Sequence, residues 1–409
     1  MAKILTMSDD PNIATGMGRV HKEIACGLRK YGHEIVSLGW FSRIGEQNTM
    51  PFKIYHTSNQ YYGQDVFDQV ILQEFPQIVI TIGDHWMVDY IANQNICKTR
   101  RLFLWIAYTP IDGTTPDGGI PPTWAYGTLN ADYVVAYTEY GKQAILKTCP
   151  EVANRITVIP HGVDTNMFKP LPEDEVKNLR RSVGLVDDHV CFLMVARNQF
   201  RKNIPEFAKA WQKFVAYNRH PKAVFWPHMV FTDPMGWNLD EVFDILGIRQ
   251  TLRYFEKIAH SSSNIDLMPE ADLNKLYNIC DIHVNIAGEG YGLASIESLA
   301  CGKPNIVLDH SGSGEQIRMS DGGLLVKCSP YYVTGKYSTE RPYPDENDLL
   351  TKLDLLYSRA DLRQKLGNAG LEWTRKTTWD AACDKWHGLI TEMMYPLRKP
   401  GGVELESIA

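Results

Sequence analysis

Residues 282–308 constrain the fold more than any other stretch of this sequence. An apolar run at 282–286 is typical of a strand, and Ile296, Leu299 and Ala300 then recur at helical spacing. Three glycines separate the two patterns, and a Gly-Lys-Pro sequence ends the helix before a second apolar run. The stretch therefore predicts a strand, a glycine loop, a short helix and a strand, which is the repeating unit of a parallel α/β sheet.

The glycine loop of this unit has the features of a ligand site. Gly288, Gly290 and Gly292 allow a ligand to approach the backbone closely, and the helix behind them offers free N–H groups and a positive dipole end to an anion such as phosphate. Glu289 lies in the loop and Glu297 about one turn into the helix, where carboxylates can accept hydrogen bonds from sugar or ribose hydroxyls. Either glutamate alone is more simply a solvated charge, but the pair favours a binding site.

The same alternation of strand and helix patterns runs along the whole chain and is interrupted once. It extends from residue 3 to 159 and again from 190 to 326, with a proline-rich linker near residue 170. Because 409 residues exceed one ordinary core, we expect two α/β domains, each with a parallel sheet covered on both faces. Further expected elements are a strand at 265–268, an exposed polar insertion at 329–347, one helix at 349–373 and a final helix at 379–394.

The composition of the chain limits which partners and which cellular location we expect for the protein. The net charge is −6 with 22% charged residues, so a nucleic-acid partner is disfavoured, although a local basic groove would escape this count. No apolar stretch is long enough for a membrane span, and the N-terminus has no secretion-signal pattern, so we expect a cytoplasmic protein whose membrane contact, if any, is peripheral. The eight cysteines lack paired metal-ligand spacing and are expected to be reduced thiols.

The first half carries its own candidate residues at predicted strand ends. Gly16 and Gly18 precede a helix and form a possible phosphate cradle, although His21 stands where a dinucleotide fingerprint needs its third glycine and a tight turn is an alternative. Asp84, His85 and Asp112 follow strands, at the edge where open α/β sheets bind ligands. A packing or capping role for His85 is an equal alternative. The long loop at 110–124 is a plausible cover for the cleft.

Two basic residues flank the first strand-to-helix loop of the second half. Arg197 and Lys202 could neutralise a diphosphate there, the arginine as a fork and the lysine as a point charge. Exposed basic loops are common, so this pair by itself is weak support for a diphosphate site.

In combination, these segments resemble the retaining glycosyltransferases of family 4, within the glycosyl transferases group 1. The Gly-Glu-Gly-Tyr-Gly-Leu loop with Glu297 is similar to the glutamate motif of that family, and Arg197 with Lys202 to its Arg-Lys clamp. Gly-Met-Gly-Arg followed by Tyr-Gly-His-Glu resembles its N-terminal motif, and residues 158–164 its interdomain segment, with His161 where asparagine is more usual. Leu276 and Tyr277, with Asp281 after them, are also similar to the segment that precedes the glutamate motif in that family.

The resemblance implies a GT-B fold, with two Rossmann-like domains facing each other across a cleft, and a set of roles. It implies an acceptor domain at 1–167, a donor domain at 168–376 and a last segment at 377–409 that crosses back to the first domain. Glu289 would bind the donor sugar, Glu297 the ribose, and Arg197 with Lys202 the leaving diphosphate. Contacts to the donor are implied for Gly16, Gly18, Gly290, Tyr291, Gly292 and Leu293.

The leading hypothesis is a retaining transferase for a hexose or related sugar, which uses a nucleoside diphosphate sugar as co-substrate and needs no metal. An epimerase or hydrolase of the same fold and a catalytically silent sugar-nucleotide binding protein are the alternatives. The family often has a His-Asp pair where this chain has Ile111 and Asp112, so the usual imidazole is missing and His85 is a possible substitute. The nucleotide, the sugar, the acceptor and the oligomeric state stay open.

Overall fold

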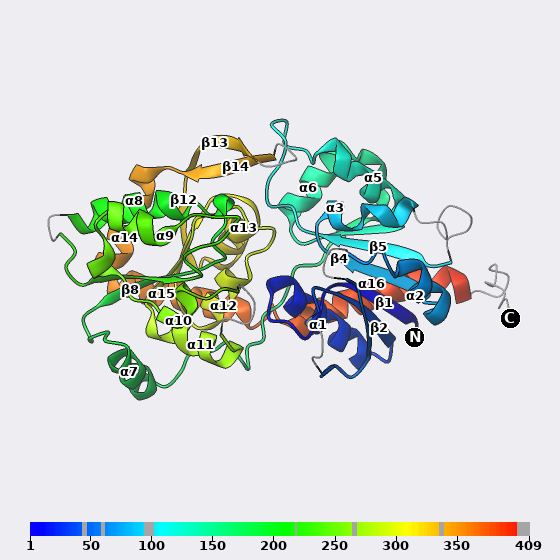
Figure 1. Cartoon of the computed structure of the whole chain (residues 1–409), viewed down its shortest axis with the longest axis horizontal. Coiled ribbons are helices and arrows are strands. Elements are labelled where there is room, and N and C mark those ends of the chain that lie inside the picture. Colours follow the sequence, from blue (N-terminus) through cyan, green and yellow to red (C-terminus); the bar gives the residue numbers. More distant parts are fainter. Residues whose placement is uncertain are drawn as a thin grey trace.

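The chain folds into two lobes that lie side by side, each built on a parallel sheet (Figure 1). The computed structural model describes residues 1–42, 47–58, 62–93, 102–216, 219–263, 268–334 and 339–398. Among the helices of these ranges, none combines the length and the apolar character that a membrane crossing requires.

The first lobe contains a seven-stranded sheet in the order β3-β2-β1-β4-β5-β6-β7, with every neighbouring pair parallel. All five residues of β4 are buried, as expected for a strand that is covered on both faces. The strands are β1 (Lys3–Asp9), β2 (Glu34–Trp40), β3 (Lys53–His56), β4 (Ile78–Ile82), β5 (Leu104–Thr109), β6 (Tyr133–Ala136) and β7 (Ile156–Val158).

Helices cover this sheet, and α1 (Gly16–Lys30) reaches the cleft. It begins where the side chain of Thr15 accepts a hydrogen bond from the Gly18 N–H, and Val20, Ile24 and Leu28 bury its apolar face. The other described α-helices of the lobe are α2 (Phe67–Glu74), α3 (His85–Val88), α5 (Pro122–Asn130) and α6 (Glu139–Thr148).

The second lobe contains a five-stranded parallel sheet in the order β12-β11-β10-β8-β9. Its strands are β8 (Val190–Val195), β9 (Ala223–His228), β10 (Ile282–Asn285), β11 (Asn305–Leu308) and β12 (Gly323–Val326). Its helices are α7 (Glu173–Ser182), α8 (Ile204–Val215), α9 (Leu239–Ile245), α10 (Glu256–Ala259), α11 (Glu270–Ile279), α12 (Leu293–Ala300), α13 (Ser311–Ser320), α14 (Glu346–Ser358) and α15 (Ala360–Thr374).

Two expectations for the second lobe are wrong. The segment expected as an exposed insertion forms an antiparallel hairpin, β13 (Cys328–Thr334) with β14 (Thr339–Pro344), which reaches the first lobe at the top of Figure 1. There the Glu340 N–H donates to the Thr114 carbonyl at 2.7 Å. The helix expected at 349–373 is two helices, α14 and α15, which meet at Arg359. The strand expected at 265–268 falls largely outside the described residues.

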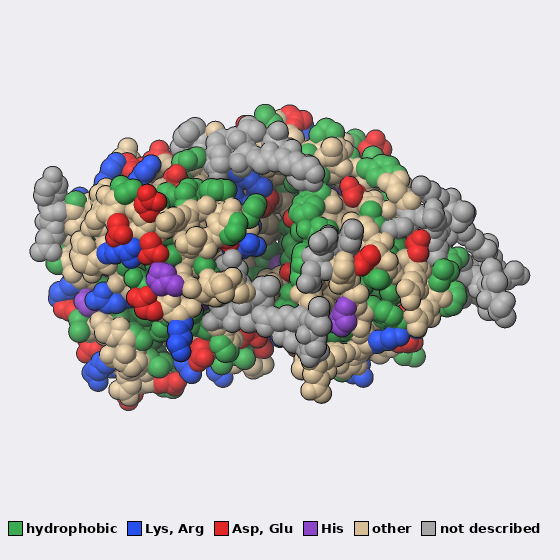
Figure 2. Space-filling model, viewed as in Figure 1, with side chains coloured by type: hydrophobic (Ala, Val, Ile, Leu, Met, Phe, Trp, Pro, Cys, Tyr) green, Lys and Arg blue, Asp and Glu red, His purple; other side chains and the backbone are tan. Residues whose placement is uncertain are grey.

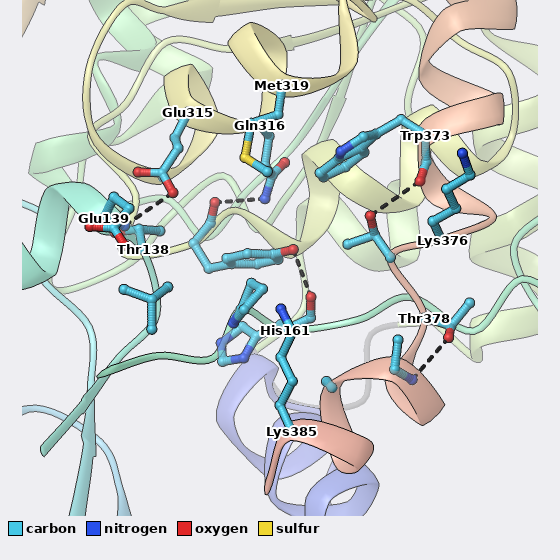
Figure 3. A pocket seen from close by; sticks show the side chains of 17 residues that line it. Thr138, Glu139, His161, Glu315, Gln316, Met319, Trp373, Lys376, Thr378 and Lys385 are labelled. Carbon is cyan, nitrogen blue, oxygen red and sulfur yellow. Dashed lines mark hydrogen bonds between the residues drawn. The ribbon is translucent and has the colours of Figure 1, made fainter. Parts of the chain in front are cut away.

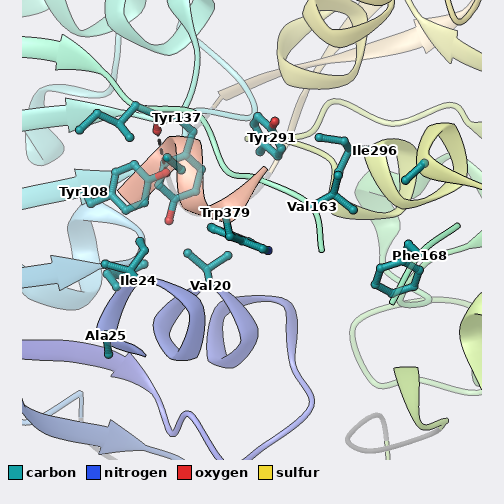
Figure 4. Close-up of a cluster of buried hydrophobic side chains, with 14 of the residues drawn as sticks. Val20, Ile24, Ala25, Tyr108, Tyr137, Val163, Phe168, Tyr291, Ile296 and Trp379 are labelled. Carbon is teal, nitrogen blue, oxygen red and sulfur yellow. Dashed lines mark hydrogen bonds between the residues drawn. The ribbon is translucent and has the colours of Figure 1, made fainter. Parts of the chain in front are cut away.

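The final helix, α16 (Trp379–Arg398), packs against α1 of the first lobe. The helices are so close that a side chain at Gly27 would collide with the sulfur of Cys383, and Trp386 is fully buried. The apolar cluster around this contact also takes in residues of the second lobe, Tyr291 and Ile296 among them (Figure 4). The two sheets therefore share a continuous apolar core beneath the cleft.

Candidate active site

The glycine loop after β10, residues 288–292, contacts the first lobe. Gly292 precedes the first residue of α12 and has φ of 100°, a backbone conformation that glycine adopts without strain. A side-chain carbon at Gly290 would lie 2.5 Å from Cβ of Pro110, which follows β5. Glycine at these positions lets the N-terminus of α12 face the end of the first sheet.

Two adjoining cavities lie between the lobes, where Figure 2 shows the surface hollowed. The first has a volume of about 300 Å³ and is lined by Asp84, Asp112, Lys202, Glu289 and residues 290–294, among others. The second has a volume of about 620 Å³ and is lined by Arg19, Arg197, His228 and Met268, among others. Both include Gly16, Met17, Val195 and Arg201 in their walls.

A network of charged side chains crosses the smaller cavity. Lys202 forms an ion pair with Glu289, and the guanidinium of Arg201 lies 3.5 Å from the second oxygen of that carboxylate. Arg201 also lies 3.3 Å from Asp112 and donates to the Gly288 carbonyl at 3.1 Å. Arg341 of the hairpin is 2.6 Å from the other oxygen of Asp112. The network therefore joins both lobes and the hairpin.

The network sets the protonation of its members. Burial and the neighbouring Arg201 lower the pKa of Lys202 to about 8. Burial alone would raise the pKa of Glu289, but Lys202 and Arg201 outweigh it and hold that pKa below its ordinary value. Burial likewise opposes ionisation of Asp112, yet Arg341 and Arg201 bring its pKa down to about 2.

Asp84 is the exception among these carboxylates. Burial, with the charge of Asp112 as the next contribution, raises the pKa of Asp84 to about 7, although Arg201 and Arg341 act in the opposite direction. At neutral pH Asp112 is therefore ionised, whereas Asp84 is only partly ionised, and both carboxylates line the same cavity.

Arg197 and Lys202 do not meet in the same cavity. The Arg197 guanidinium donates to the buried Asp233 carboxylate at 2.9 Å, and 49% of its side chain is exposed at the edge of the larger cavity. Arg201 occupies the position between the cavities, and sequence reasoning missed it. The available signal was its place beside Lys202 in the strand-to-helix loop, where the 3₁₀ turn Phe200–Lys202 forms.

Glu297 is buried, and other side chains already contact both of its oxygens. Arg19 of α1 forms an ion pair with one oxygen, and the Tyr277 hydroxyl donates to the other at 2.9 Å. Arg19 also lies 2.8 Å from Glu270. Burial raises the pKa of Glu297, with Arg19 acting against it. Arg19 is a second residue that sequence reasoning missed, because its partner is 278 positions away.

The imidazole candidates lie in different places. Ile111 is buried in the core of the first lobe and is not among the residues that line the two cavities. His85 is buried against Trp124, its Nδ1 lies 2.9 Å from the Thr128 hydroxyl, and it is not among the residues that line the two cavities. His161 does line the smaller cavity, 2.7 Å from the Tyr108 hydroxyl. Burial lowers the pKa of His161 to about 3, so it is neutral.

Within the described ranges, no group of three or more His, Cys, Asp or Glu side chains is arranged to hold a metal ion.

Comparisons with known proteins agree with the geometry. A family model described as Glycosyl transferases group 1 matches residues 250–331. D-inositol 3-phosphate glycosyltransferase of Stackebrandtia nassauensis is 24% identical over 312 residues, which cover 74% of this chain and 62% of that relative. The chain thus spans less than two thirds of the length of this relative.

Solved structures resemble the whole chain. Sucrose-phosphate synthase from Thermosynechococcus elongatus has a TM-score of 0.75 at 16% identity, covering 96% of this chain and 99% of that one. Anabaena Alr3699/HepE in complex with UDP and glucose has a TM-score of 0.72 at 14% identity, covering 96% and 100%. The fold is GT-B, and the resemblance to the group 1 glycosyltransferases is confirmed. Placement in family 4 stays a prediction.

Proposed function

We propose that this chain transfers a sugar from a nucleoside diphosphate sugar to an acceptor hydroxyl and retains the anomeric configuration. One observation supports this most directly: Lys202, Arg201 and the N-terminus of α12 converge with Glu289 on one cavity, opposite two carboxylates of the other lobe. Cations and free N–H groups suit a diphosphate, and carboxylates suit sugar hydroxyls. The family-model match over residues 250–331 includes this loop and α12.

In the proposed reaction, the bond between the anomeric carbon and the diphosphate oxygen breaks, and negative charge develops on the leaving group. Lys202, Arg201 and the backbone N–H groups at the start of α12 stabilise that charge, which is the main catalytic contribution of the protein. The acceptor oxygen attacks from the same face, and its proton passes to the departing phosphate. No general base is then required from the chain.

Glu289 has a dual role in this proposal. Without donor it neutralises Lys202, so the buried lysine is not left without a counter-ion. With donor bound, the diphosphate neutralises Lys202 instead, and the Glu289 carboxylate accepts hydrogen bonds from sugar hydroxyls. Arg201 lies between Glu289 and Asp112 and offsets the repulsion between the two carboxylates.

UDP sugars are the donors to test first. The similar structures include HepE with UDP and glucose and an Escherichia coli protein described as trehalose-6-phosphate bound with UDP-2-fluoro glucose. The acceptor is expected against Asp84 and Asp112, on the first lobe. We infer that the reaction proceeds without a metal ion, since cations of the chain already face the diphosphate position.

The decisive experiment measures nucleotide release from UDP-glucose, UDP-galactose and UDP-N-acetylglucosamine, with and without mixed acceptors and with EDTA throughout. Replacing Lys202 by alanine is expected to lower the rate about 10²- to 10³-fold, as removal of one charge-stabilising group does elsewhere. Lys213→Ala is the matched control, because that lysine forms its ion pair with Glu346 on the surface.

The outcomes separate the hypotheses. A product with the inverted anomeric configuration by NMR would overturn the retaining mechanism. Donor binding without release or transfer would favour the silent binding protein, and an epimerised donor without acceptor would favour the epimerase.

A further inference from the structure

Arg201 is the most exposed of the three cations that surround Asp112 and Glu289. Its side chain is 30% exposed, against 9% for Lys202 and 12% for Arg341. Arg201 also lines both cavities of the cleft, whereas Lys202 belongs to the wall of the smaller one. An anion that enters the cleft therefore finds Arg201 more accessible than either neighbouring cation.

Each carboxylate beside Arg201 has a closer cationic partner. Nη1 of Arg201 lies 3.3 Å from Asp112 and 3.5 Å from Glu289. Arg341 is nearer to Asp112, at 2.6 Å, and Lys202 forms a close ion pair with Glu289. A charge-assisted N–H···O bond is about 2.7–2.9 Å long, so both carboxylate contacts of Arg201 are longer than such a bond. Arg201 is thus the cation that this network can most readily release to a ligand.

Arg341 reaches Asp112 because the β13–β14 hairpin docks on the first lobe. The Glu340 N–H donates to the Thr114 carbonyl at 2.7 Å, and these two residues form an antiparallel bridge. A side-chain carbon at Gly113 would lie 2.7 Å from the Glu340 carbonyl oxygen and 2.9 Å from a guanidinium nitrogen of Arg341. Glycine at this position therefore lets the hairpin and its arginine approach the end of β5.

Further contacts between the lobes hold the same edge of the cleft. Glu315 of α13 accepts hydrogen bonds from the backbone N–H groups of Glu139 and Tyr140, both at 3.1 Å, at the start of α6 (Figure 3). The Tyr140 hydroxyl also lies 3.2 Å from Nε2 of His310. Because these contacts do not involve the hairpin, we expect the lobes to stay docked when Arg341 alone is replaced.

We propose that Arg341 is a positioning residue for the donor diphosphate: it neutralises Asp112 and so leaves Arg201 available to bind that diphosphate. This inference rests on the proposed transferase function, which puts a diphosphate in the smaller cavity. Without Arg341, the cation nearest to Asp112 is Arg201. A partly buried carboxylate competes strongly for such a cation, because its charge is poorly solvated. The guanidinium of Arg201 then turns to Asp112 and is lost to the ligand.

The test measures the Kd of UDP for the full chain by calorimetric titration at about pH 7. Arg341→Gln is expected to weaken UDP binding about tenfold, since one charge-assisted contact to the diphosphate is lost. Arg341→Lys should weaken it by no more than about threefold, because an ammonium group also neutralises Asp112. Arg359→Gln is the matched control, because that arginine forms its ion pair with Asp361 on the surface.

Removal of the competing carboxylate distinguishes a positioning role from a structural one. In the double variant Arg341→Gln/Asp112→Asn, Arg201 no longer has a charged competitor at position 112, so the Kd of UDP should return to within about twofold of that of the unaltered chain. Asp112→Asn alone should bind UDP at least as tightly as the unaltered chain. A loss caused by displacement of the hairpin would persist in the double variant, since asparagine restores no contact of the hairpin.

Two results would overturn the positioning role. These are equal UDP binding by Arg341→Gln and the unaltered chain, or a double variant that binds UDP no better than Arg341→Gln. Arg341→Met, which is also uncharged, replaces the glutamine variant in both comparisons if that variant does not fold. If the unaltered chain binds none of UDP, GDP and ADP, the proposed transferase function fails and this inference fails with it. If it binds GDP or ADP instead of UDP, that nucleotide is used in the same titrations.

Discussion

Replacing Arg19 with glutamine tests how the buried Glu297 is stabilised between the lobes. Arg19 belongs to α1 of the first lobe, and its side chain is 17% exposed; the Glu297 side chain on α12 of the second lobe is 5% exposed. Without the arginine, Glu297 keeps only the hydroxyl of Tyr277 as a partner. Removing one member of a buried ion pair costs about 3–5 kcal/mol, and the remaining hydrogen bond places this case near about 3 kcal/mol.

The expected loss of stability in Arg19→Gln increases with pH. Burial already holds the pKa of Glu297 above its ordinary value, and the loss of Arg19 removes the largest opposing influence. The folded variant then keeps a proton that the unfolded chain releases near pH 4.3, as for an ordinary glutamate. Its stability therefore falls as the pH rises from about 5 to 8, relative to the unaltered chain.

Urea unfolding at about pH 5 and pH 8 measures both effects. Glu270→Gln is the control, since it removes the more exposed partner of Arg19, 29% exposed, and is expected to cost about 1 kcal/mol or less. The reasoning is refuted if Arg19→Gln loses no more than Glu270→Gln, or if its loss is equal at the two pH values. A confirmed loss would also show that the carboxylate expected to bind ribose is shared with the first lobe.

Three further results are expected. UDP affinity should fall up to about tenfold per pH unit above pH 8 as Lys202 loses its proton, and Lys202→Arg should remove that dependence in titrations from pH 7 to 10. Burial raises the pKa of Asp84 to about 7, so ionisation of this carboxyl destabilises the folded chain increasingly from about pH 4 to 7. The Tm of Asp84→Asn should therefore rise relative to that of the unaltered chain over this interval. A Tm difference that stays constant with pH would contradict this. Gly290→Ala should weaken UDP binding at least about tenfold, because the added carbon meets Pro110, whereas Gly388→Ala, with open space around it, should not.

Local patterns were sufficient for most of the framework. The strand, glycine loop and helix expected within residues 282–308 form as β10 and α12, because apolar periodicity and flanking glycines act within a few residues. The hairpin β13–β14 was missed because its strands are polar and proline-bearing, and its pairing with Thr114 depends on the other lobe.

The candidate site was predictable only in part, because some of its contacts also join segments that are far apart in the sequence. Lys202 and Glu289, both named as candidates from the sequence, line one cavity, and each lies in a strand-to-helix loop. Arg201, Arg19 and Arg341 were missed, because their partners belong to another segment or lobe and no local pattern encodes such a contact. His85 was a candidate because it follows a strand, with a packing role as an equal alternative, and its ring stacks on that of Trp124.

The crossing of α16 has a consequence for the order in which the protein can be completed during synthesis. Trp386 and Ile390 are buried in the same cluster as Val20 and Ile24, so part of the core of the first lobe comes from residues that leave the ribosome after the whole second lobe. Until then, the apolar stripe of α1 is without its cover and is available to other chains or to chaperones. A nascent chain stalled before residue 379 therefore carries an incomplete first lobe, and the two lobes mature together.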